Sequence, residues 1–101
     1  MKENLTPKQK EVVKVMRETG GRVSEFWRDG GKHVIEVLVP SDGFYEIVLT
    51  IHNRTFSELV RKNVLRYMPT MTQYENGWQR GWYELNKEVC QLGLTLRILN
   101  G

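Results

Sequence analysis

The chain has 101 residues, of which 40% are hydrophobic, 27% charged and 10% aromatic, and its formal net charge is +3. This composition is typical of one globular domain with its own core and excludes a disordered or collagen-like chain. A single cysteine, Cys90, excludes an internal disulfide, and its apolar neighbours favour a small buried side chain over a nucleophile.

The first predicted element is a helix at about residues 7–18. Thr6 and Gln9 have the spacing of a capping box, and Pro7 suits the first helical position. Gly20 and Gly21 end this helix, because glycine adopts the left-handed cap conformation without strain.

Three strands are predicted next, at residues 22–28, 32–39 and 44–51, joined by turns at 29–30 and 40–43. Alternating residues give the second and third strands one aliphatic face. That face contains Ile35, Val37, Tyr45, Ile47, Leu49 and Ile51. The opposite face is also too apolar to be wholly exposed, so we expect the rest of the chain or a partner to cover part of it.

A second helix is predicted at residues 55–67, with Thr55 and Glu58 as its capping box and Pro69 at its end. A third is predicted from Asn76 to Val89, where aromatic and aliphatic residues recur at helical spacing despite two glycines. Alternating leucines then predict a strand over 92–98.

These elements give an α+β fold in one domain, residues 1–101, with the order α-β-β-β-α-α-β. We expect an antiparallel sheet with the helices mainly on one of its faces. The polar N-terminus and the lack of a long apolar run favour a cytoplasmic protein with no membrane segment.

The excess positive charge is confined to residues 52–68, because acidic and basic residues balance on both sides of this segment. It contains Glu58 and four basic residues, which are Arg54, Arg61, Lys62 and Arg66. Such a stripe is either an anion-binding surface, as for nucleic acid, or an ordinary solvated helix face.

The turn Asp29-Gly30-Gly31 leads into Lys32 and His33 at the start of the second strand. His33 is either a partly buried histidine with a structural hydrogen bond or a general base that acts on an RNA 2′-hydroxyl, with Lys32 holding a phosphate. His52 is more simply a turn residue, and no histidine or cysteine pair has metal-ligand spacing, so we expect no metal or cofactor.

Trp27, Trp78, Trp82 and Tyr83 are many aromatic residues for so short a chain. Aromatic rings beside basic residues can stack nucleic-acid bases or anchor a protein partner. Trp78 and Trp82 flank Arg80, which can lie over an indole ring. The simpler interpretation is that both tryptophans cover the second sheet face or the side of a helix.

The glycine-x-histidine motif Gly31-Lys32-His33 and the basic second helix resemble those of the HicA family of toxins over residues 6–68. That family has a fold similar to double-stranded RNA-binding domains. The resemblance implies an RNA-binding or RNA-cleaving protein, with His33 in the catalytic position and an antitoxin as partner. Lys32 departs from the serine usual there, and residues 70–101, the predicted C-terminal helix and strand, have no counterpart in the minimal family fold.

The sequence therefore predicts a small nucleic-acid-binding domain, with Lys32 and the basic stripe in contact with RNA and His33 as the catalytic residue if it is a ribonuclease. The alternative is a protein-interaction module, either an inhibitor or accessory factor or a homodimer. In that case exposed aromatic residues and the second sheet face would meet the partner.

Overall fold

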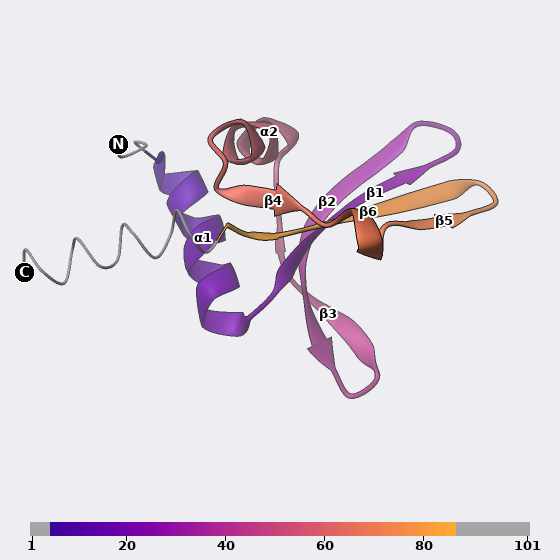
Figure 1. Ribbon diagram of the computed structural model, residues 1–101, viewed down its shortest axis with the longest axis horizontal. Coiled ribbons are helices and arrows are strands. Elements are labelled where there is room, and N and C mark those ends of the chain that lie inside the picture. The colour runs from indigo at the N-terminus through magenta and orange to yellow at the C-terminus, as the bar shows by residue number, and fades with distance from the viewer. Residues whose placement is uncertain (1–4, 87–101) are drawn as a thin grey trace, which may run out of the picture.

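The computed structural model describes residues 5–86, and the first element, helix α1, spans Pro7–Thr19 (Figure 1). Its capping box is formed as predicted: the Gln9 amide donates to Thr6 Oγ1 at 3.2 Å, and the Thr6 amide donates to Gln9 Oε1 at 3.2 Å. Gly20 ends the helix in the left-handed conformation, with φ of 72°. Local sequence alone accounts for both ends of α1.

Gly20 and Gly21 allow a matched pair of substitutions. A Cβ at Gly20 would meet nothing within 4 Å, so Gly20→Ala should cost about 1 kcal/mol of unfolding free energy through its backbone alone. A Cβ at Gly21 would lie 2.8 Å from Val37 Cγ1, so Gly21→Ala should cost about 1–3 kcal/mol through overpacking. Urea unfolding measures both, and asparagine should restore part of the stability at position 20 only.

The predicted meander is confirmed. Strands β1 (Arg22–Arg28), β2 (Lys32–Ser41) and β3 (Phe44–Thr50) pair antiparallel in sequence order. The β2–β3 connection is a two-residue turn, in which both Asp42 and Gly43 have positive φ. Strand β2 is the longest, with residues 32–38 paired to β1 and residues 36–41 paired to β3. Its end therefore extends beyond β1 with β3 as a separate arm (Figure 1).

The second helix is shorter than predicted. Helix α2 spans Asn53–Arg61, with His52 as its N-cap in place of Thr55. Asn63 has a φ of 62°, and the Val64 amide donates to the Leu59 carbonyl, which ends the helix well before Pro69. The chain then enters strand β4, Leu65–Tyr67, where the sequence predicted a further helical turn.

The third predicted helix is wrong. Residues 69–71 form the short 3-10 helix η1 (Pro69–Met71), and strands β5 (Gln73–Glu75) and β6 (Trp78–Leu85) follow as a hairpin. Gly77, with φ of 87°, makes the two-residue connection between them. The strand predicted at 92–98 and Cys90 lie outside the described residues.

The described elements form an α+β domain with a six-stranded antiparallel sheet, as the predicted fold class requires. The strand order is β3-β2-β1-β6-β4, and β5 pairs with β6. Strand β6 therefore lies in the middle of the sheet between β1 and β4, so the segment after Pro69 completes the sheet. In the described part of the chain, no helix is long and apolar enough to cross a membrane.

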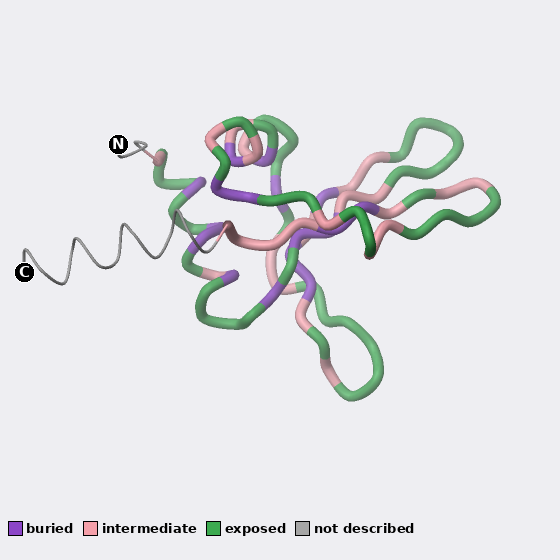
Figure 2. Tube along the Cα trace, in the orientation of Figure 1, coloured by how far each residue is buried: buried purple, intermediate pink, exposed green. Residues whose placement is uncertain are grey.

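Helices α1 and α2 pack on one face of the sheet, which we call the helix face (Figure 2). The core there joins Val12, Val13 and Met16 of α1 and Phe56 and Leu59 of α2 to Val23, Ile35, Val37 and Leu65 of the sheet. The opposite, far face has its own buried residues, which are Ser24, Leu38 and Trp82. The Trp82 indole donates to Gln73 Oε1, so the start of β5 covers part of the far face, as expected.

A register shift between Val37 and Leu38 changes which β3 residues face the core. Val37 pairs with Leu49, but Leu38 pairs with Ile47, so β3 has one extra residue at this point. Ile47 therefore shares a face with Leu38, opposite Leu49, and its side chain is 56% exposed. The sequence wrongly placed Ile47 and Tyr45 on the buried face.

Candidate functional site

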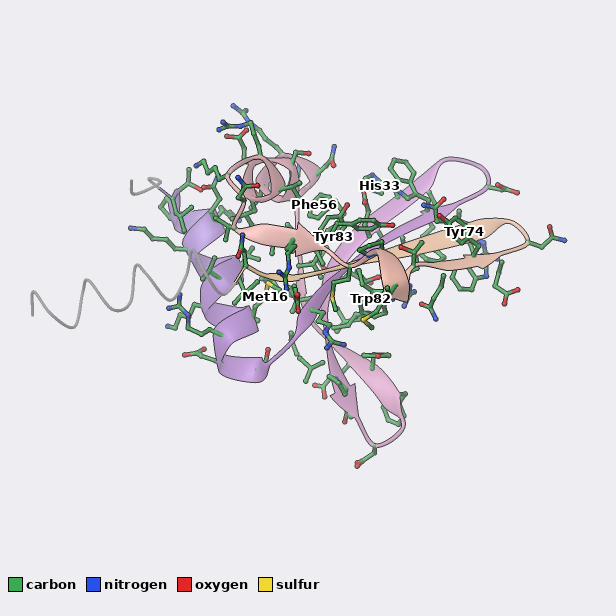
Figure 3. The ribbon with its side chains drawn as sticks, viewed as in Figure 1. Met16, His33, Phe56, Tyr74, Trp82 and Tyr83 are labelled. Carbon is green, nitrogen blue, oxygen red and sulfur yellow. The ribbon has the colours of Figure 1, made fainter. Side chains whose placement is uncertain are left out.

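Glu25, His33 and Tyr83 form a polar cluster on the helix face, where the core ends and the β1–β2 hairpin begins to extend (Figure 3). His33 Nε2 lies 3.1 Å from Glu25 Oε2, and the Tyr83 hydroxyl donates to Glu25 Oε1 at 3.3 Å. The side chains of His33 and Glu25 are each 19% exposed, so the pair is shielded but reachable from solvent.

Aromatic rings hold this cluster in place. The Trp27 indole stacks on the His33 imidazole, with centroids 3.6 Å apart and planes 8° from parallel. Phe56 of α2 meets the Tyr83 ring edge-to-face at 4.9 Å, and Tyr67 of β4 lies 5.3 Å from it. Rings from three elements, β1, α2 and β4, thus pack against His33 and Tyr83 and hold the cluster in place.

Burial raises the pKa of Tyr83 to about 12, and the nearby Glu25 carboxylate adds to this increase. Tyr83 therefore remains a neutral hydrogen-bond donor to Glu25 at physiological pH. The same carboxylate favours a hydrogen on His33 Nε2 and leaves Nδ1 as the ring atom able to accept a proton. The cluster thus combines an imidazole with a carboxylate that orients it.

Tyr83→Phe should reduce the loss of unfolding free energy that the protein shows at alkaline pH. The folded pKa of about 12 lies above the ordinary value of 10.0, so the unfolded chain loses this proton first. The Tyr83 contribution to stability is complete below pH 10 and is lost as pH rises through the folded pKa. Urea unfolding at a series of pH values should therefore show a smaller alkaline loss in the variant. If the unfolding free energy of both proteins fell equally with pH, the raised pKa of Tyr83 would be contradicted.

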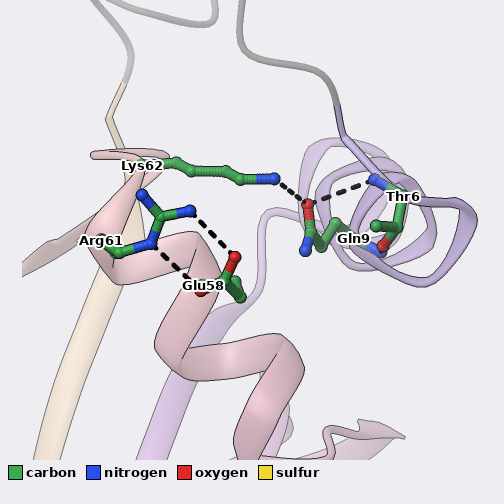
Figure 4. Close-up of polar contacts among 5 residues, drawn as sticks. All are labelled: Thr6, Gln9, Glu58, Arg61 and Lys62. Atoms are coloured by element: carbon green, nitrogen blue, oxygen red, sulfur yellow. Dashed lines mark hydrogen bonds and ion pairs between the residues drawn. The ribbon is translucent and has the colours of Figure 1, made fainter.

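The members of the predicted basic stripe have separate partners, and Figure 4 shows those of Arg61 and Lys62. Arg61 pairs with Glu58, its Nη2 lying 2.9 Å from Oε1, and this contact holds the pKa of Glu58 below its ordinary value. Lys62 Nζ donates to Gln9 Oε1 at 2.8 Å, which ties the end of α2 to α1. Arg66 is paired with Glu84 in the β4–β6 ladder, so it lies on the far face, away from α2.

The remaining predicted residues lie at separate places. Arg54 is in the first turn of α2, where its amide donates to His52 Nδ1 at 3.3 Å; His52 is thus a capping residue. Lys32 pairs with Arg28 across the base of the β1–β2 turn, one residue from His33 but on the far face. Residues 5–86 contain no group of three side chains suited to hold a metal ion.

Sequence reasoning missed Glu25 and Tyr83. Glu25 alternates with Val23 and Trp27 on the core side of its strand, and a carboxylate at such a position is a usable signal. Tyr83 had no such signal, because its segment was assigned to a helix and its partner Glu25 is 58 residues away.

The tryptophans of β6 mainly serve the far face, as the simpler interpretation predicted. Trp82 is 3% exposed, and Tyr45 of the β2–β3 arm lies 5.2 Å from its ring. The Arg80 guanidinium lies over the Phe26 ring at 5.0 Å and over the Trp82 ring at 5.8 Å. Trp78 packs beside Phe26.

No protein-family model, curated protein or solved structure matches this chain.

Proposed function

We propose that this domain binds single-stranded RNA and cleaves it without a metal ion, with His33 as the catalytic base. The observation that supports this most strongly is the Glu25–His33–Tyr83 cluster, which joins an imidazole to a carboxylate at 3.1 Å in a shielded but accessible place.

The reaction class follows from the groups present. His33 Nδ1 removes the proton of a ribose 2′-hydroxyl, and the resulting oxygen attacks the adjacent phosphorus. A bond forms between the 2′-oxygen and phosphorus, the bond from phosphorus to the 5′-oxygen breaks, and the leaving oxygen takes a proton from water. The products are a 2′,3′-cyclic phosphate and a 5′-hydroxyl end.

Glu25 acts here as a positioning residue, because it holds the His33 ring and stabilises the imidazolium that forms. Tyr83 fixes Glu25 in turn through its second carboxylate oxygen. Lys32 and Arg28 lie at the base of the turn on the opposite face from His33, where their two exposed positive charges can contact phosphates beyond the one that reacts, and Arg54 adds a third charge at the start of α2.

The direct test is incubation of the purified protein with a single-stranded RNA in the presence of a chelator, with a DNA of the same sequence as control. Cleavage of the RNA alone, with cyclic phosphate ends, supports the proposal. RNA that remains intact, or DNA that is also cut, contradicts it, because a 2′-hydroxyl is the only nucleophile in the mechanism.

A second function, docking of a protein partner, is favoured by the β2–β3 arm. Phe44 and Ile47 are 66% and 56% exposed there, beside the half-exposed Tyr45. Exposed rings and aliphatic side chains grouped on one hairpin are typical of a protein interface. The partner is either an antitoxin, as the HicA resemblance implies, or a second copy of the chain.

A pull-down from cell extract, with and without nuclease, separates the two functions. A partner retained after nuclease treatment by the parent protein, and lost from a Phe44→Ser, Ile47→Ser variant, supports docking through the arm. Capture that depends on RNA, and that the double substitution leaves unchanged, supports nucleic-acid binding alone.

A further inference from the structure

A hollow of about 280 Å³ lies where the tips of the β1–β2 and β5–β6 hairpins run side by side (Figure 1). The Asp29 amide donates to the Gly77 carbonyl at 2.9 Å, which fixes the two tips to each other. The residues that line the hollow include Trp27, Tyr74, Trp78, Asp29, Gly77 and Gln79. Its volume is near the lower end of ligand pockets, which suits one small planar group.

The hollow adjoins the Glu25–His33–Tyr83 cluster through Trp27. Strand register aligns His33, Trp27, Gln79 and Tyr74 in one row across β2, β1, β6 and β5. Because paired residues of neighbouring strands point to the same side, all four side chains project from the helix face of the sheet. Trp27 joins the two features directly, since it stacks on His33 and also lines the hollow.

The aromatic side chains here have large exposed surfaces. Tyr74 is 70% and Trp27 45% exposed, so their rings contribute little to the core and remain free to contact a ligand. Exposed aromatic rings on one face of a sheet provide a surface on which unpaired nucleic-acid bases stack. Stacking alone does not discriminate among the bases.

The Asp29 carboxylate can discriminate among the bases. Guanine presents two adjacent donors, N1–H and the N2 amino group, and both can bind the two oxygens of one carboxylate. Adenine and cytosine present one amino group beside a ring nitrogen that accepts, and this nitrogen repels a carboxylate. Asp29 Oδ2 lies 3.5 Å from the position of a Cβ on Gly77, so this carboxylate is directed across the turn toward β6.

We propose that the hollow binds one unpaired guanine base of RNA, stacked on Trp27 and Tyr74 and recognised by the carboxylate of Asp29. This inference rests on the proposed function, since the guanosine so held would place its neighbouring phosphate at His33. The protein would then cleave single-stranded RNA preferentially beside guanosine.

Nucleotide binding tests the site independently of catalysis. Guanosine 3′-monophosphate is titrated into the full chain carrying His33→Ala, with adenosine 3′-monophosphate as the matched ligand. Binding is followed by the tryptophan fluorescence of the protein, because two of its three tryptophans, Trp27 and Trp78, line the hollow. We expect saturable quenching by the guanine nucleotide, and binding of the adenine nucleotide that is weaker by about tenfold or more.

Two sets of variants locate the site. Tyr74→Ala should weaken guanine nucleotide binding by about tenfold, whereas Tyr45→Ala, on the β2–β3 arm, should not change it. Asp29→Asn leaves one acceptor in place of two, so it should reduce the preference for guanine over adenine. Circular dichroism confirms that each variant is folded.

The outcomes separate this inference from the proposed function. Equal affinity for both nucleotides, or no binding by a folded protein, overturns the guanine site even if the parent cleaves RNA. Guanine binding by a protein that leaves RNA intact supports the site and overturns the ribonuclease. Cleavage products that end in guanosine 2′,3′-cyclic phosphate support both.

Discussion

His33→Ala should abolish metal-independent RNA cleavage, lowering the rate by at least about 100-fold, because a methyl group cannot accept the 2′-hydroxyl proton. Expression of the parent should also arrest host growth if the resemblance to a toxin extends to function, and the substitution should relieve that arrest. The measurement is the rate of appearance of cyclic phosphate ends with chelator present.

Stability must be controlled before the loss is assigned to chemistry. His33 stacks on Trp27 at the open end of the core, so its removal should lower the melting temperature only slightly. Glu25→Gln, which keeps the size of the side chain, provides the matched variant. This substitution should lower kcat and leave KM nearly unchanged, because Glu25 contacts His33 and, in the proposed mechanism, does not contact RNA. A His33→Ala protein that cleaves at the parent rate would retire the mechanism.

Trp82→Ala should be the most destabilising single change, at about 3–5 kcal/mol of unfolding free energy. The indole is 3% exposed, lies between β1 and β4 in the middle of the sheet, and donates to Gln73. Its removal leaves a cavity on the far face and an unpaired acceptor. Denaturant unfolding followed by far-ultraviolet circular dichroism measures the loss without relying on the tryptophans themselves.

Trp78→Ala is the control that distinguishes the strand from the helix that the sequence predicted. In a helix the two tryptophans would share one buried stripe, and their removal would cost similar amounts. In the observed strand Trp78 is only half-buried at the hairpin end, beside Phe26, so it should cost clearly less than Trp82. Equal losses would count against the described sheet.

Both predictions depend on the position of β6 in the sheet. The strand provides Trp82 to the far face and Tyr83 to the cluster on the helix face, so consecutive residues serve the second core and the candidate site. A change of register in β6 by one residue would exchange these roles. The segment after Pro69 therefore contributes to the candidate site, although it lies outside the resemblance.

The candidate site was only partly predictable. The turn at Asp29 and the alternation that follows were sufficient to identify His33 as a residue at the start of a strand. Its partner Glu25 comes from the preceding strand, and Tyr83 from a distant one. The basic stripe was predicted as a unit from its spacing in the sequence, but the early end of α2 separates its members.

The sequence by itself determined the features that depend on neighbouring residues. Thr6, Gln9 and Gly20 set both ends of α1, and the turns at 29–31 and 42–43 set the meander, because caps and tight turns are satisfied within a few residues.

Only the tertiary structure decided features that local patterns leave ambiguous. Trp78 and Trp82 are four residues apart, a spacing that puts both on one face of a helix and equally on one face of a strand. Pairing with β1 and β4 selected the strand. Ile47 and Val48 are both apolar, so the extra residue in β3 changed the buried face without altering the hydrophobic pattern. The Glu25–His33–Tyr83 cluster exists only because the sheet brings three strands together.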